Sequence, residues 1–283
     1  MGEWIEKTLG ELTSYIAKGI PPKYVEEAGI ETIRVLNQKC NRNYRISYSE
    51  SRLHDNSVKK VPADKILRDF DVLINSTGTG TAGRVAQIWH VPEPTTLDGH
   101  MILMRPTREI DPLYYGYAIK SCHIQVESFA EGSTGQTEIN KRRLLDEVVI
   151  RFPNSLSEQK AIGRMLKAID EKIQNNEKIN ENLQEQARSI FQSWFIDYKP
   201  FGGAAPSDWH PSTLGEVAIM KTDSWSPAKN PDVVVEHYSI PAFDEQHYPV
   251  FEIASGIKSN KYILTSDSVM ISKLNPDTKR IWR

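Results

Sequence analysis

Cysteine is scarce in this sequence: Cys40 and Cys122 are the only two, and neither has a second Cys or a His close enough to complete a zinc motif. We therefore expect neither a disulfide framework nor a structural metal, and the composition fits a reducing cytoplasm. Long apolar runs are missing, and the first residues lack the basic-then-apolar pattern of a secretion signal. The sequence thus predicts a cytoplasmic protein without a membrane segment.

An excess of one charge is absent as well, because 35 Lys and Arg residues face 37 Asp and Glu residues, for a formal net charge of −2. This balance argues against a general polyelectrolyte binder, but DNA binding needs only a local basic surface. A content of 39% hydrophobic and 25% charged residues is typical of globular proteins. A chain of 283 residues has room for one large or two medium domains.

A catalytic cluster is also lacking. Metal-dependent nuclease chemistry needs clustered carboxylates, typically with a lysine close by, and the nearest candidate is Glu158 with Lys160 in the first turn of an expected helix. The Asp- or Asn-Pro-Pro-aromatic tetrapeptide of an amino-methyltransferase does not occur, and the seven histidines are scattered. We therefore expect a chain without catalytic or metal-ligating residues of its own.

What the sequence does contain is an internal repeat. The segment Trp4 with Thr8–Leu12 recurs as Trp209 with Thr213–Val217, at a constant offset of 205 residues. A second echo pairs residues 72–76 with residues 269–273 at an offset of 197. The repeat predicts one full module followed by the opening portion of a second copy.

A single long helix is predicted from Ser155 to about Tyr198. Ser155 and Glu158 match a capping box, and Pro200 followed by two glycines supplies the stop. Roughly 44 residues at 1.5 Å each span on the order of 65 Å. An apolar stripe with the 4,3 spacing of a coiled-coil seam runs along the helix: Ile162, Leu166, Ile169, Ile173, Asn176, Asn180, Leu183, Ala187, Ile190 and Trp194.

The alternative for this helix is an amphipathic element that lies on its own domain. The seam asparagines favour the coiled coil, because buried amides fix register and partner number. Before the helix, strands are expected at residues 71–76, 85–91, 100–105 and 148–152, with a helix from Pro112 to about Cys122. The predicted fold class is α+β: a β-rich domain at 1–153, a long coiled-coil helix at 154–200, and a partial second copy at 201–283.

The first candidate for chemistry is a glycine motif. Gly78, Gly80 and Gly83 spell G-x-G-x-x-G, the fingerprint of dinucleotide sites, but residues 84–89 resemble a strand where that fingerprint needs a helix. A glycine-rich hairpin is therefore predicted, and a nucleotide-binding enzyme is the alternative. The polar residues of this hairpin could face a phosphate backbone: Thr77, Thr79, Thr81 and Arg84.

Basic residues gather at two further places beside small residues. Lys18 and Lys23 flank Gly19, Pro21 and Pro22. The second group follows the glycine-bearing loop at 132–136 and comprises Ser133, Thr134, Gln136, Lys141, Arg142 and Arg143. Small residues allow backbone amides to approach phosphates while Lys and Arg neutralise charge, so both groups are candidates for DNA binding. The alternative for each group is an ordinary solvated surface.

Together these features resemble the specificity subunits of type I restriction-modification systems, and the resemblance covers the whole chain. The resemblance rests on five features of the sequence. The first three are the Trp-x(4)-Leu-Gly-Glu openings at Trp4 and Trp209, the Gly-x-Pro-Pro step at 19–22, and the strand at 74–76 before the hairpin. The other two are the run from Gly132–Gln136 through Ile139 and Leu144 to Pro153, and a helix that opens with Glu158, Gln159 and Ile162 and closes with Trp194 and Phe195.

The resemblance implies a non-catalytic subunit in which two target-recognition domains each read one half of an asymmetric, bipartite site in double-stranded DNA. Conserved helices would set the spacing and dock modification subunits. By the same resemblance, adenine methylation with S-adenosylmethionine belongs to those modification subunits, and cleavage and translocation with ATP and Mg belong to a restriction subunit.

One departure from the family pattern concerns the second module. Arg283 corresponds to about Ala86 of the first module, so the expected second recognition domain is partial and the second long helix is missing. The chain could be a fragment, a product of rearrangement or frameshift, or a half-subunit that self-associates through its long helix and reads a symmetric site. A coiled-coil scaffold without a DNA role is the remaining alternative.

Overall fold

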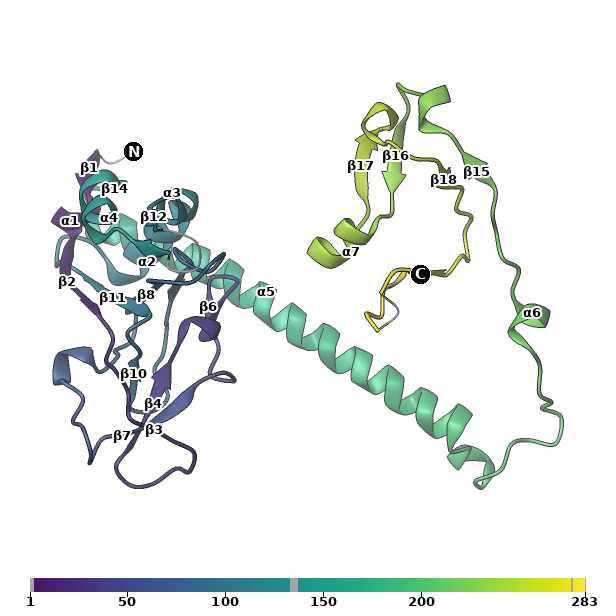
Figure 1. Cartoon of the computed structure of the whole chain (residues 1–283), viewed down its shortest axis with the longest axis horizontal. Coiled ribbons are helices and arrows are strands. Elements are labelled where there is room, and N and C mark those ends of the chain that lie inside the picture. The colour runs from purple at the N-terminus through teal and green to yellow at the C-terminus, as the bar shows by residue number, and fades with distance from the viewer. Residues whose placement is uncertain (1–2, 133–136, 276, 283) are drawn as a thin grey trace. The chain divides into compact units, whose positions relative to one another are not determined.

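The computed structural model describes residues 3–132, 137–275 and 277–282 (Figure 1). The chain forms two compact units, residues 1–188 and residues 189–283, and each is described by itself. Among the described residues, no helix has the length and apolar character that crossing a membrane requires.

The first unit is built around a four-stranded antiparallel sheet. Its strand order is β2 (Thr13–Lys18), β11 (Met101–Pro106), β8 (Val72–Asn75) and β9 (Val85–Gln87). Alternate residues of a strand point to opposite faces, and here both faces are buried. Ile74 and Ile102 lie in one hydrophobic core, whereas Leu73 and Leu103 lie in another. This double burial explains why residues 72–74 of β8 and 101–104 of β11 are continuous apolar runs.

Helices cover one face of this sheet (Figure 1). They are α1 (Leu9–Leu12), α2 (Pro112–Ser121), α3 (His123–Ser128) and α4 (Lys141–Glu147), joined by the antiparallel pair β1 (Trp4–Thr8) and β14 (Val149–Pro153). Leu12, Tyr115, Phe129 and Phe152 are fully buried in the core between them.

A second sheet contributes to the core on the other face. Its order is β10 (Thr95–Leu97), β4 (Thr32–Leu36), β7 (Arg52–Asp55) and β3 (Tyr24–Val25), with β10 parallel to β4 and the other pairs antiparallel. Leu36, Cys40 and Leu97 are buried in this second core. Two short pairs complete the unit: β5 (Asn41–Arg42) with β6 (Arg45–Ile46), and β12 (Ala130–Glu131) with β13 (Glu138–Ile139).

The predicted strands at 71–76, 100–105 and 148–152 and the helix at 112–122 are confirmed to within one or two residues. The strand predicted over 85–91 is shorter, because it ends at Gln87. Its neighbour β8 begins at Val72, directly opposite Gln87, and one further bond, from Ile88 N to Asp71 O (3.0 Å), continues the pairing.

The predicted long helix is confirmed as α5 (Leu156–Phe191), which is followed by a π-helical turn at Gln192–Ile196. The helical path ends at Tyr198, whose φ of 50° is left-handed. The prediction for the start of α5 was wrong in one respect. In this part of the described chain the Ser155 hydroxyl lies 2.8 Å from the hydroxyl of Ser157 and forms no capping box with Glu158.

A capping box does occur at the repeated motif. Thr8 Oγ1 accepts a hydrogen bond from Glu11 N (3.3 Å), and the Glu11 carboxylate accepts one from Thr8 N (2.8 Å). In the second copy, the Glu216 carboxylate accepts from Thr213 N in the same way (2.8 Å). The repeated Thr-Leu-Gly-Glu motif therefore forms the same kind of helix start in both copies.

The second unit contains short elements. They are α6 (Leu214–Val217), α7 (Ile240–Gln246), and the antiparallel pairs β15 (Ser224–Trp225) with β18 (Lys261–Tyr262), β16 (Val234–His237) with β17 (Val250–Ile253), and β19 (Met270–Ile271) with β20 (Ile281–Trp282). Leu214 and Val217 are 77% and 72% exposed, whereas their counterparts Leu9 and Leu12 are fully buried. The sequence repeat is thus not matched by equivalent packing.

Candidate nucleic-acid interface

The glycine motif lies in the turn between β8 and β9, as predicted. Gly78, Gly80 and Gly83 have φ values of 110°, 70° and 86°, a region that favours glycine. A strand follows the motif, so the helix that a dinucleotide site requires at this point is replaced by β9. The hairpin interpretation is confirmed, and the nucleotide-site alternative loses its structural basis.

The base of this hairpin is fixed and its tip is exposed. A Cβ atom on Gly83 would lie 2.5 Å from the Cα of Glu127 in α3, so only glycine allows the hairpin to approach that helix. Arg84 donates from its guanidinium to Gly80 O (3.1 Å) and accepts at its carbonyl from Asn41 Nδ2 (2.8 Å). The side chain of Arg84 therefore lies along the hairpin, close to the exposed tip residue Thr79.

The start of the hairpin lies beside the segment that follows the glycine-bearing loop. Thr77 and Glu138 form an isolated antiparallel bridge, and Ile139 N donates to Ser76 O (2.8 Å). Thr77 Oγ1 is 2.9 Å from His100 Nδ1. Three candidates of that loop, Ser133, Thr134 and Gln136, lie outside the described residues.

Lys18 joins this group from the end of β2, where it forms an ion pair with Glu138. The structure therefore brings three of the predicted segments together: the lysine of the Gly-x-Pro-Pro step, the glycine hairpin, and the flank of the glycine-bearing loop. Lys23, by contrast, directly precedes β3 in the second sheet and is exposed.

A buried histidine positions the backbone at Lys23. His54 is fully buried, its Nδ1 accepts from Lys23 N (2.8 Å), and its Nε2 faces Lys59 O (2.7 Å). Since Nδ1 accepts a backbone proton, Nε2 carries the ring proton and donates it to Lys59 O. A further lysine, Lys65, reaches Gly19 O with its Nζ atom (3.2 Å).

Lys59 and Lys65 were missed by the sequence reasoning. The adjacent pair of lysines at 59 and 60 was a signal of a basic surface, but its proximity to Lys23 depends on the tertiary contact through His54. Lys65 had no such signal, because it lies 46 residues from Gly19, the residue that it contacts.

One buried carboxylate lies among these basic residues. Asp98 accepts from His100 N (2.9 Å) and from the Tyr24 hydroxyl (3.5 Å), and burial raises the pKa of its carboxyl group. The guanidinium of Arg52 stacks over the Tyr24 ring at 3.4 Å from its centroid. Tyr24 thus connects an interior carboxylate with a surface cation.

The basic triplet Lys141, Arg142 and Arg143 opens α4, and its members differ in their surroundings. Arg143 forms ion pairs with Glu131 (3.1 Å) and Glu147 (2.8 Å), so its charge is compensated within the protein. Arg142 is 3.4 Å from Asp146 and highly exposed. Lys141 forms no ion pair with the residues that the structure describes, which leaves its charge available for an external anion.

The predicted seam of α5 lies at the surface. Ile162 differs from the rest, because it packs against the core of its own domain. Ile169, Ile173 and Leu183 are 53%, 44% and 55% exposed, and Leu166, Asn176, Asn180, Ala187, Ile190 and Trp194 are exposed as well. An exposed row of apolar residues, interrupted by Asn176 and Asn180, fits one helix of a coiled coil.

Comparison with known proteins decides the family. Residues 1–185 match the family described as "Type I restriction modification DNA specificity domain". The chain belongs to this family.

Two curated relatives of this specificity-domain chain are named as specificity subunits of type I restriction enzymes. It is 28% identical over 257 residues to the type I restriction enzyme MjaIX specificity subunit of Methanocaldococcus jannaschii, covering 87% of this chain and 58% of that protein. It is 24% identical over 232 residues to the HindI specificity subunit of Haemophilus influenzae, covering 79% of this chain and 48% of that protein. The chain therefore spans about half the length of these relatives.

Solved structures similar to this specificity-domain chain include a type I restriction-modification S subunit from M. genitalium, with a TM-score of 0.48 and 17% identity over 84% of this chain and 56% of that one. The HsdS subunit from Thermoanaerobacter tengcongensis has a TM-score of 0.46 and 17% identity, covering 68% of this chain and 44% of that one.

Proposed function

We propose that this chain is a sequence-specific DNA-binding subunit of a type I restriction-modification complex, and that its first unit reads one half of a two-part DNA site. The observation that carries the proposal is the convergence of Lys18, the glycine hairpin and the segment at Glu138 at one place in a chain of the DNA specificity domain family. The names of the curated relatives, which are specificity subunits, support the same role.

The side chains at and near the glycine hairpin suit contacts with the phosphate backbone of DNA and with the edges of its bases. Lys18 lies beside the hairpin, and Lys23, Lys59 and Lys141 lie elsewhere on the same unit. Their positive charges would neutralise phosphates and position the protein on the duplex. The hydroxyls of Thr77, Thr79 and Thr81 and the backbone of the glycine hairpin supply short hydrogen-bonding groups. Arg84, beside the hairpin tip, is our candidate for base reading, because a guanidinium can bind guanine through two hydrogen bonds.

We propose that methylation, translocation and cleavage belong to partner subunits. Modification subunits would dock on the α5 region and methylate adenine with S-adenosylmethionine, and a restriction subunit would use ATP and Mg for translocation and cleavage. In the chain itself, the described residues hold no group of three His, Cys, Asp or Glu residues arranged for a metal ion. We propose that the chain selects the site and that its partners carry out the reactions.

A second candidate is a half-subunit that forms a homodimer and reads a symmetric site. The exposed seam of α5 favours this version, because a second copy of the same helix could cover Ile169, Ile173 and Leu183. Light scattering of the purified chain separates the two versions. A stable dimer that binds a palindromic duplex supports the homodimer, whereas a monomer that gains DNA affinity only with modification subunits supports the first proposal.

The proposed function is tested by the salt dependence of binding to duplex DNA in the assembled complex. Phosphate contacts make log K fall linearly with log salt, with a slope of about −0.9 per contact.

Arg84→Ala should weaken binding to the preferred sequence by about 1–3 kcal/mol and relax its selectivity. Lys178→Ala, at an exposed position of α5 opposite to the seam, is the control. An Arg84→Ala variant that distinguishes the preferred sequence from other sequences as strongly as the wild type does would refute base reading by this residue.

A further inference from the structure

Apart from the seam residue Ile162, the first part of α5 contacts its own domain through a second face of the helix, which is polar. This polar face is formed by Gln159, Gly163, Lys167, Asp170 and Glu177. At 3.6 residues per turn, its direction differs from that of the seam by about 90° around the helix axis. The same helix can therefore hold the domain with one face and present the apolar seam with the other.

Gln159 is the innermost residue of the polar face and is fully buried. Its Oε1 accepts from Asp111 N (2.7 Å), and its Nε2 donates to Pro153 O (2.8 Å) and to Glu109 O (3.5 Å). These backbone groups come from the segment before α2 and from the end of β14. A helix that rotates or tilts at this point leaves buried donors and acceptors unpaired, which is costly.

One turn later, Gly163 allows the helix to pack closely on the start of α2. A Cβ atom at this position would lie 3.3 Å from Leu113 Cγ and 3.3 Å from Tyr114 N, closer than most side-chain contacts. The absence of a side chain therefore sets how near α5 lies to α2. Together with Gln159, it defines one end of the attachment.

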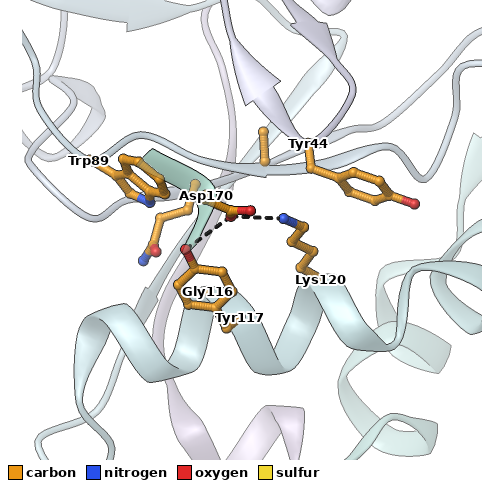
Figure 2. Close-up of a pocket in the computed structure, with 8 residues that line it drawn as sticks. Tyr44, Trp89, Gly116, Tyr117, Lys120 and Asp170 are labelled. Atoms are coloured by element: carbon orange, nitrogen blue, oxygen red, sulfur yellow. Dashed lines mark hydrogen bonds and ion pairs between the residues drawn. The ribbon is translucent and has the colours of Figure 1, made fainter. Parts of the chain in front are cut away.

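Charged residues hold the other end of the attachment. Asp170 accepts from the Tyr117 hydroxyl (3.0 Å) and from Lys120 Nζ (3.0 Å), both on α2, as Figure 2 shows. Lys167 Nζ lies 4.8 Å from the centre of the Trp89 ring. Glu177 forms an ion pair with Arg45 of β6. From Gln159 to Glu177 the attachment covers about 27 Å of helix at 1.5 Å per residue.

We propose that the polar face fixes the angle between α5 and the recognition domain and thereby sets the spacing between the two DNA half-sites, with Gln159 as its main positioning residue. This inference rests on the proposed function. The ion pair of Glu177 with Arg45 is exposed and restrains the helix only weakly, so the helix acts as a lever beyond Asp170. Arg188 lies about 27 Å beyond Asp170, and a tilt of about 10° moves it by about 5 Å. That displacement exceeds the roughly 3.4 Å rise of one base pair.

The first test does not involve DNA. Spin labels on Val58→Cys, an exposed loop residue, and Glu185→Cys, on the distal part of α5, report the domain-to-helix distance once Cys40 and Cys122 are replaced by Ala. Gln159→Met keeps a similar volume but removes the hydrogen bonds, and Gln186→Met makes the same change at an exposed helix position. We expect Gln159→Met to broaden the distance distribution by several Å, on the order of the displacement from a ~10° tilt, and Gln186→Met to leave it unchanged.

An unchanged distribution in folded Gln159→Met would overturn the proposal. If that variant does not fold, the double variant Asp170→Asn with Glu177→Gln tests the outer end of the attachment and leaves the buried amide intact. Broadening in the double variant supports the proposal, and a distribution equal to that of the wild type overturns it.

The second test selects DNA with a library in which two fixed half-sites are separated by spacers of different length. The assembled wild-type complex should select one spacer length. Gln159→Met should lower the preference for that length over its neighbours by at least about fivefold while the half-site sequences stay the same. If the wild type selects no spaced pair of half-sites, the proposed function fails. If it does and Gln159→Met keeps the same strict spacer preference, only the positioning role fails.

Discussion

Lys18 of β2 and Glu138 of β13 form an ion pair where the glycine hairpin begins, although 120 residues separate them in the sequence. Glu138 reaches this place because its backbone pairs with Thr77. Both side chains remain partly exposed, so the pair can open at little cost when a phosphate competes for the lysine. Glu138 thus lowers the net positive charge of the candidate DNA surface.

The first prediction concerns this pair. Glu138→Gln should strengthen binding to DNA at low salt and make the slope of log K against log salt steeper by about 0.9, because Lys18 becomes free to contact a phosphate. Glu181→Gln removes the same charge from an exposed position of α5 and should change neither quantity. Identical slopes for wild type and Glu138→Gln, measured by fluorescence anisotropy, would show that Lys18 makes no phosphate contact.

The second prediction concerns the basic start of α4. Alanine at Lys141, Arg142 and Arg143 should weaken DNA binding for all sequences and flatten the salt slope by up to about 0.9 for each lost contact. Because Arg143 pairs with Glu131 and Glu147, its removal also disturbs the protein.

Lys141→Ala alone is therefore the cleaner variant for this patch. It should flatten the slope without changing the thermal melting temperature, whereas Arg143→Ala should lower the melting temperature. Normal binding by both Lys141→Ala and the triple variant would remove the patch from the DNA surface.

The third prediction concerns the seam of α5. Ile169→Glu or Ile173→Glu should prevent helix pairing or assembly with partner subunits, because a charge would be buried in an apolar interface. The free chain should unfold at nearly the same denaturant concentration, since exposed positions usually change stability by less than about 0.5 kcal/mol. Lys178→Glu introduces the same side chain at an exposed position on the side of the helix opposite to the seam. Assembly states that are equal for all three variants in light scattering would show that the seam is not an interface.

The fourth prediction is a dependence of stability on pH that comes from Asp98. Burial raises the pKa of this carboxyl group above its ordinary value of 3.8, so the folded state keeps the proton at pH values where the unfolded chain has lost it. Its contribution to stability therefore falls as pH rises from about the ordinary pKa to the raised one.

Asp98→Asn removes this contribution but keeps an acceptor for His100 N. The variant should gain stability relative to the wild type as pH increases through that window, as measured by urea unfolding at several pH values. A difference between the two proteins that does not vary with pH would contradict the prediction.

The framework of the fold followed from local sequence patterns. The runs at 72–74 and 101–104 are apolar on both faces because the sheet lies between two cores, and the hairpin followed from glycines between two apolar segments. The length of α5 followed from the 4,3 spacing of its apolar residues. These features depend on residues that are near one another in the chain.

Other features depend on tertiary contacts that no local pattern contains. The strongest periodic pattern in α5 is that of its apolar seam. The polar face with Gln159 and Gly163 was therefore not predicted, although the four-residue spacing of these two residues is visible in the sequence. The capping box of Thr8 and Glu11 was also visible, as Thr-x-x-Glu, but was interpreted only as a repeat. The ion pair of Lys18 with Glu138 could not be found from sequence, because strand pairing brings these residues together.

The central claim is that this chain makes DNA binding sequence-specific. Its most direct test is selection from random duplex DNA by the complex of this chain with its modification subunits, followed by measurement of affinities for the selected and scrambled duplexes. Specific sites are typically bound at least about 10³-fold more tightly than non-specific DNA. We expect enrichment of one defined sequence and a difference in affinity of that order. Equal affinity for selected and scrambled duplexes, at a salt concentration where both bind, would contradict it.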